Sequence, residues 1–173
     1  MSTIDPASTS TVRPTASPLP VLEVAEMAEL SPALLERGVD AAIWARATPC
    51  GVHRWLDQVS TDAWPRGRFV LSPSDVAACV ADLFSKTGAQ TSPALAWLSE
   101  DVQRLAHFIR DFTGMPKVRL RLEPVFDNAC AKFHIDNVTL RLICTYFGPG
   151  TEISSTPDHP MQLKAFKPAH PFC

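Results

Sequence analysis

The clearest hydrophobic pattern in the chain lies between Ser92 and Gly114. Apolar residues recur there at steps of three and four, at Leu95, Leu98, Val102, Leu105, Phe108, Ile109 and Phe112. Ser92 fits a helix N-cap, Pro93 the first helical position and Gly114 the C-terminal stop. The pattern therefore predicts a long amphipathic helix that packs one face against a core.

Similar patterns predict three further helices upstream. Ser31-Pro32 and Pro49 bracket a helix over residues 31–48, whose apolar stripe is Leu34, Leu35, Val39, Ile43 and Ala47. A short helix is expected over residues 52–59, and another from Ser72-Pro73 to about Gly88. A brief strand over residues 68–71 precedes the last of these.

After Pro116 the hydrophobic period changes from 3.6 to 2. Residues 118–122 and 138–146 alternate apolar and polar side chains, which is typical of half-buried strands, and Gly148-Pro149-Gly150 then predicts a turn. Because the helices come first and the strands afterwards, the order favours an α+β domain over repeated βαβ units.

Composition supports one globular domain. The chain has 173 residues, with 46% hydrophobic and 20% charged side chains, which is typical of a single soluble domain. Of the first 20 residues, 12 are Ser, Thr or Pro, so residues 1–20 are predicted to form a disordered tail. We expect the domain to span residues 21–152, followed by an atypical proline-rich tail over 153–173.

Charge and cysteine content narrow the function classes. The net charge of −2, without a run of like charges, argues against nucleic acid as a partner. An odd number of cysteines without a CxxC pair fits neither a disulfide framework nor a zinc ribbon: Cys50, Cys79, Cys130, Cys144 and Cys173. With no apolar run long enough to span a membrane and no signal peptide, the expected location is the cytoplasm. The oligomeric state stays open.

The candidate chemistry lies just before the second predicted strand, at His134 and Asp136. If that strand begins a few residues early, both side chains share the parity of Val138 and Leu140 and point to the interior. A carboxylate on an apolar face needs a cation or several donors. His-x-Asp is the sequence-local half of the 2-His-1-carboxylate triad of non-haem Fe(II) oxygenases. The plain structural alternative is that His134 donates to a carbonyl and Asp136 caps a turn.

The surrounding residues resemble a known family. Four runs carry the resemblance, namely residues 119–123, 130–138, 140–146 and 148–152. They resemble the bacterial domain of unknown function family 1826, most strongly over residues 95–152. The FHxDN element of the family falls on Phe133, His134, Asp136 and Asn137. The RLxCTYxGPGT element falls on Arg141, Leu142, Cys144, Thr145, Tyr146, Gly148, Pro149, Gly150 and Thr151.

The resemblance implies a fold but no established activity. Family members look like double-stranded β-helix proteins related to oxygenases, and their genes often lie near genes of zinc supply. The expected fold is therefore a set of N-terminal helices followed by an incomplete double-stranded β-helix, or jelly-roll, sheet. Family members also continue beyond Glu152 into a late His-Arg-Ser-Pro segment, which this chain lacks. We therefore expect the chain to be truncated or frameshifted after Glu152.

Three functions stay open at this point. The first is a metal-binding, oxygenase-like enzyme that uses Fe(II) through His134 and Asp136, with a small-molecule substrate and, by analogy, a 2-oxo acid co-substrate. The second is a non-catalytic Zn(II)-binding protein linked to zinc homeostasis, to which Cys130 and Cys144 could add thiolates. The third is an inactive, truncated remnant. The other ligand candidates are His159 and His170, and Arg141 is a candidate partner for an anion.

Overall fold

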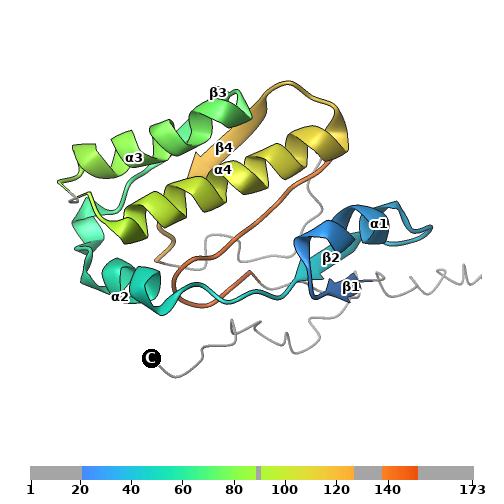
Figure 1. Ribbon diagram of the computed structural model, residues 1–173, viewed down its shortest axis with the longest axis horizontal. Helices are drawn as coiled ribbons and strands as arrows, with labels where there is room; N and C mark the ends of the chain where they lie inside the picture. Colours follow the sequence, from blue (N-terminus) through green and yellow to red (C-terminus); the bar gives the residue numbers. More distant parts are fainter. Residues whose placement is uncertain (1–20, 89–90, 127–137, 152–173) are drawn as a thin grey trace, which may run out of the picture.

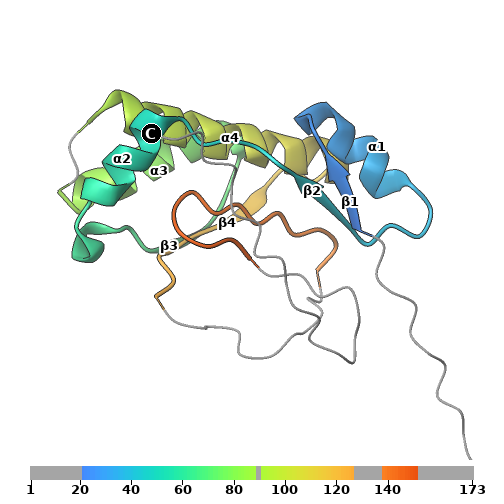
Figure 2. The same cartoon turned by 90° about the horizontal axis from the view of Figure 1, so that it is seen from below.

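The computed structural model describes residues 21–88, 91–126 and 138–151. Two helices, α3 (Val76–Lys86) and α4 (Pro93–Thr113), lie side by side on one face of an antiparallel ribbon of β3 (Gly67–Leu71) and β4 (Val118–Leu122). Figure 2 shows the helices on one side and the ribbon on the other. The α+β class expected from the sequence is confirmed.

Helix α4 forms as its sequence predicts, because both of its ends are capped. The Ser92 side chain accepts a hydrogen bond from the backbone N–H of Leu95 at 3.1 Å, and Pro93 occupies the first turn. At the other end Gly114 adopts φ +70°, and its N–H donates to the carbonyl of Arg110 at 2.8 Å. A residue with a Cβ is strained in this left-handed conformation, so glycine is favoured here.

The core lies between α4, α3 and α2 (Cys50–Gln58). Its buried members are Val52, Leu56, Val76, Val80, Phe84, Leu95, Leu98, Val102, Ala106 and Val118. The predicted helices over residues 52–59 and 72–88 are confirmed, the second as the 3-10 turn η3 (Pro73–Asp75) continued by α3. The apolar faces of these three helices therefore pack together in one cluster, as their hydrophobic patterns predicted.

The ribbon shows the alternation predicted for residues 118–122. Val118 pairs with Leu71 and Leu120 with Phe69. Val118, Leu71 and Leu120 pack in or against the core under the helices, while Arg119 and Arg121 are exposed. The brief strand expected over residues 68–71 is β3. The 3-10 turn η2 (Thr61–Ala63) precedes it and ends at Trp64.

The region before α2 corrects the predicted helix over residues 31–48. Helix α1 (Leu30–Leu35) has only six residues and comes after the turn η1 (Met27–Glu29). Gly38 then adopts φ +85°, and β2 (Ala41–Trp44) pairs in parallel with β1 (Val21–Val24). The helix ends where Glu36 adopts an extended conformation, the left-handed Gly38 turns the chain, and β2 then pairs with a strand 20 residues upstream.

Residues 138–151 correct the second predicted strand. They pass beneath α4 without joining any sheet of the described residues, although the turn glycine Gly148 is found at φ +82°. The predicted alternation of burial is confirmed from Leu140 to Tyr146 and is wrong at Val138, which was expected to face the interior but is exposed. The more buried side chains are Leu140, Leu142, Cys144 and Tyr146, and the exposed ones are Arg141, Ile143 and Thr145. Side-chain contacts, and not a backbone ladder, fix this segment.

Over the described ranges there are two separate two-stranded sheets, neither of them closed, and the double-stranded β-helix expected from the family resemblance is not seen there. No helix in the same ranges is both long and apolar enough to cross a bilayer. The predicted tails, residues 1–20 and 153–173, lie outside the described residues, so the domain limits stay a prediction.

Candidate functional site

A buried carboxylate on α4 is the centre of the most strongly connected polar group in the structure. Asp101 is only 3% exposed and falls within the apolar stripe of α4, between Leu98 and Leu105. Burying an unpaired carboxylate is strongly unfavourable, so its partners decide whether the fold is stable.

Arg46, just beyond the end of β2, supplies the main partner. Its Nη1 donates to Oδ1 of Asp101 at 2.6 Å and its Nη2 to Oδ2 at 2.5 Å, a bidentate pair. The hydroxyl of Tyr146 donates to Oδ2 at 2.6 Å, and Arg104 pairs with Oδ1 from one turn along the helix. Together with Cys144, whose thiol contacts Arg46, these residues form what we call the Asp101 network.

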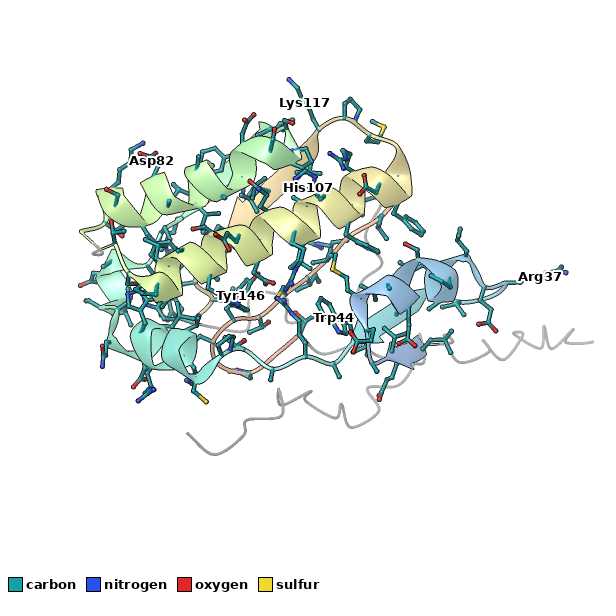
Figure 3. All side chains as sticks on the ribbon, viewed as in Figure 1. Arg37, Trp44, Asp82, His107, Lys117 and Tyr146 are labelled. Atoms are coloured by element: carbon teal, nitrogen blue, oxygen red, sulfur yellow. The ribbon has the colours of Figure 1, made fainter. Side chains whose placement is uncertain are left out.

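Aromatic rings and a thiol enclose the Arg46 guanidinium. Its central carbon lies 4.9 Å from the ring centre of Trp44 and 5.6 Å from that of Tyr146. Figure 3 shows Trp44 and Tyr146 close together beside the middle of α4. Nη2 also contacts the Sγ of Cys144, a free thiol, at 3.0 Å. The indole N–H of Trp44 donates to the carbonyl of Ala25 at 3.0 Å, which extends the connection to the loop after β1.

The network keeps Asp101 ionised. Burial acts to raise the pKa of this carboxyl, but hydrogen bonds from Arg46 and Tyr146 and the charge of Arg46 outweigh it and hold the pKa below its ordinary value. Burial raises the pKa of the Tyr146 hydroxyl, and the neighbouring Cys144 and Asp101 raise it further. Burial lowers the pKa of Arg46, but its hydrogen bond to Asp101 leaves it raised overall.

These protonation states favour positioning over proton transfer. A carboxylate with a lowered pKa, already accepting from three side chains, is a weak general base at neutral pH. What the network does join is three parts of the chain distant in sequence: the end of β2, the middle of α4 and the segment carrying Cys144 and Tyr146.

The chain matches a known protein family over most of its length. A family model described as "Protein of unknown function (DUF1826)" matches residues 26–170. The chain belongs to the DUF1826 family. The match begins just after β1 and runs past Glu152, so it is wider than residues 95–152, the range of strongest resemblance in the sequence. Among curated proteins and solved structures, no significant match was found.

The two residues predicted to bind metal in this DUF1826 chain, His134 and Asp136, lie outside the described residues. So do Cys130, His159 and His170. Within the part of the chain that the structure describes, no three His, Cys, Asp or Glu side chains gather closely enough to hold a metal ion. Arg141, the candidate anion partner, is exposed.

Sequence reasoning missed the Asp101 network, although part of it was visible. Asp101 stands three residues after Leu98 and four before Leu105, so helical spacing places it on the buried face. A charged residue at such a position predicts a buried partner. Nothing in the sequence pointed to Arg46, because its approach depends on the strand β2 that we predicted as helix.

Proposed function

We propose that this DUF1826 chain is a metal-binding domain in which His134 and Asp136 supply two ligands to Fe(II) or Zn(II). The residue types and their spacing support the proposal, since His-x-Asp resembles half of the ligand set of non-haem Fe(II) dioxygenases. A double-stranded β-helix fold, expected from the family resemblance, is part of the same proposal.

One structural observation carries the proposal furthest: the chain on the C-terminal side of the motif is firmly anchored. Two residues do the anchoring, Tyr146 through its hydrogen bond to Asp101 and Cys144 through its contact with Arg46. In sequence, His134 and Asp136 have the same parity as these two half-buried positions, although Val138, which shares that parity and lies nearest the motif, is exposed. A metal site needs ligands held by a rigid support, and the Asp101 network supplies one close to the motif in sequence.

The same contacts bear on the identity of the remaining ligands. The thiol of Cys144 lies against the Arg46 guanidinium, and a metal ion at that thiol would be repelled by the arginine charge. We therefore propose that Cys144 is a positioning residue and not a zinc thiolate. The non-catalytic zinc-binding alternative must draw its further ligands from elsewhere in the chain.

The test is anaerobic titration of the full chain with Fe(II) and with Zn(II). We expect one metal ion per chain, lost in the variant His134→Ala, Asp136→Ala. The matched control is His107→Ala, Asp111→Ala, which removes the same residue types from α4 and should bind as the wild type does. Equal binding by both variants, or no binding by folded wild-type protein, would contradict the proposal.

A second measurement distinguishes the oxygenase-like function from the non-catalytic zinc-binding function. A 2-oxo acid added to the Fe(II) form should change its visible absorption if open coordination positions remain, as an oxygenase requires. Tight Zn(II) binding, with no response of the Fe(II) form to the acid, would favour the non-catalytic function instead.

A further inference from the structure

An open surface pocket beside the ribbon has a lining of mixed chemistry that neither the core nor the Asp101 network explains. Its volume is about 400 Å³, and it is lined by Thr61, Asp62, Trp64, Arg66 and Phe126. That volume is at the lower end for small-molecule sites. All of the lining except Phe126 comes from residues 61–66, so a short piece of chain builds most of the pocket.

Two aromatic rings form the apolar wall. The ring centres of Trp64 and Phe126 lie 6.4 Å apart at an angle of 42°. The indole N–H of Trp64 donates to the carbonyl of Val59 at 2.9 Å, and the edge-on ring of Phe147, 5.5 Å away, packs against it. Trp64 is thus held in place, whereas Phe126 is 62% exposed and offers a large apolar face to a ligand.

Two charges of opposite sign share this lining. Within the described residues, neither Asp62 nor Arg66 makes an ion pair, with each other or with any other side chain. The Arg66 guanidinium lies 5.9 Å from the ring centre of Phe126, which orients it along the aromatic wall. A ligand carrying a single charge would meet one attractive and one repulsive group.

We propose that this pocket binds a small zwitterion with an apolar side chain, the chemistry of an apolar α-amino acid. The carboxylate pairs with Arg66 and the ammonium group with Asp62, while the side chain covers the rings of Phe126 and Trp64. Thr61 adds a hydroxyl to the polar side of the lining. This proposal does not depend on the metal site.

The test uses L-phenylalanine and two analogues, each lacking one charge. N-acetyl-L-phenylalanine has no ammonium group, and L-phenylalaninamide has no carboxylate. Binding is monitored by NMR through the indole N–H signal of Trp64, assigned with Trp64→Phe; the other three tryptophans serve as internal controls. We expect L-phenylalanine to shift the Trp64 signal selectively and to bind about fivefold more tightly than either analogue, the effect of one exposed ion pair.

Two variants test which residue pairs with each charge of the ligand, and two more serve as controls. Arg66→Gln should abolish the preference over L-phenylalaninamide only, and Asp62→Asn the preference over N-acetyl-L-phenylalanine only. The matched controls, Arg68→Gln on the exposed face of β3 and Asp57→Asn on α2, should keep both preferences. The proposal is overturned if the Trp64 signal does not respond, if the three ligands bind equally, or if the control variants lose the preferences as well.

Discussion

Helix α4 and the β1–α1–β2 unit, residues 21–44, both contain a serine directly before a proline, and the two regions turn out differently. Ser92-Pro93 opens a helix of 21 residues, whereas Ser31-Pro32 lies inside a helix of six. In α4 the apolar spacing continues to a capping glycine, but after α1 a left-handed Gly38 turns the chain into β2. The Ser-Pro pair therefore begins a helix only at α4, and the residues on either side of the pair determine where a helix begins and how long it is.

The two regions also differ in how they are stabilised. Ten buried side chains form the core cluster around α4, α3 and α2, whereas the buried apolar residues of the β1–α1–β2 unit are Leu30 and Ala33. Figure 1 shows the unit at one end of the molecule, beside the helices. Its strongest polar connection to the core is the Asp101 network, reached through Arg46 just after β2. Variants in each region and in the link between them can test this contrast.

The largest expected effect is in the core. Leu98→Ala should lower the free energy of unfolding by about 4 kcal/mol, because Leu98 is 2% exposed and closely surrounded, so a cavity remains. Leu30→Ala should lower it by less than half as much, since the small unit around it can collapse. Urea denaturation measures both values. Equal losses would show that the two regions are equally packed.

Second comes the link between the regions. Asp101→Asn leaves the Arg46 guanidinium without its counter-charge and should destabilise the fold by about 3 kcal/mol. The control Asp111→Asn, on the exposed side of α4, should change stability by less than about 0.5 kcal/mol. Hydrogen exchange should show larger losses of protection in β1 and β2 than in α3. A uniform loss would contradict a linking role.

Acid should remove part of the same stabilisation. The pKa of Asp101 is lower in the folded chain than its ordinary value of 3.8, so the folded state holds this proton less tightly than the unfolded state does. The contribution of Asp101 is therefore complete above about pH 4 and is lost as the pH falls through the folded-state pKa. The difference in unfolding free energy between wild type and Asp101→Asn should shrink from pH 7 to pH 3. If that difference stayed constant between pH 7 and pH 3, the charge of the Asp101 carboxylate would not be what stabilises the folded state.

The smallest effect is expected at the segment on the C-terminal side of the metal motif. Tyr146→Phe removes one hydrogen bond to a carboxylate and should lower the free energy of unfolding by about 1.5 kcal/mol. The exposed Thr145→Val serves as control. If metal binding at His134 and Asp136 is confirmed, Tyr146→Phe should also weaken the metal affinity. An unchanged affinity would show that the hydrogen bond from Tyr146 to Asp101 does not support the metal site.

The errors in the sequence-based prediction have one physical cause. Capped, amphipathic helices and the strand over residues 118–122 were predicted correctly, because their signals are local. Residues 31–48 were misread because β2 exists only through its pairing with β1. Residues 140–146 kept the predicted alternation of burial but no ladder, since the described chain offers them no neighbouring strand, and Val138 is exposed against the prediction. The prediction that His134 and Asp136 bind metal stays a prediction, because both residues lie outside the described residues.

By itself, the sequence determined the family, the α+β class and the helices from α2 to α4. These depend on side-chain type, spacing and caps, all of which act over a few residues. The tertiary structure alone decided that Arg46, Asp101 and Tyr146 meet, and that Asp62 and Arg66, which make no ion pair among the described residues, share an open pocket with Trp64 and Phe126. Most of these residues lie far apart in the sequence, and only the packing of the whole chain brings them into contact.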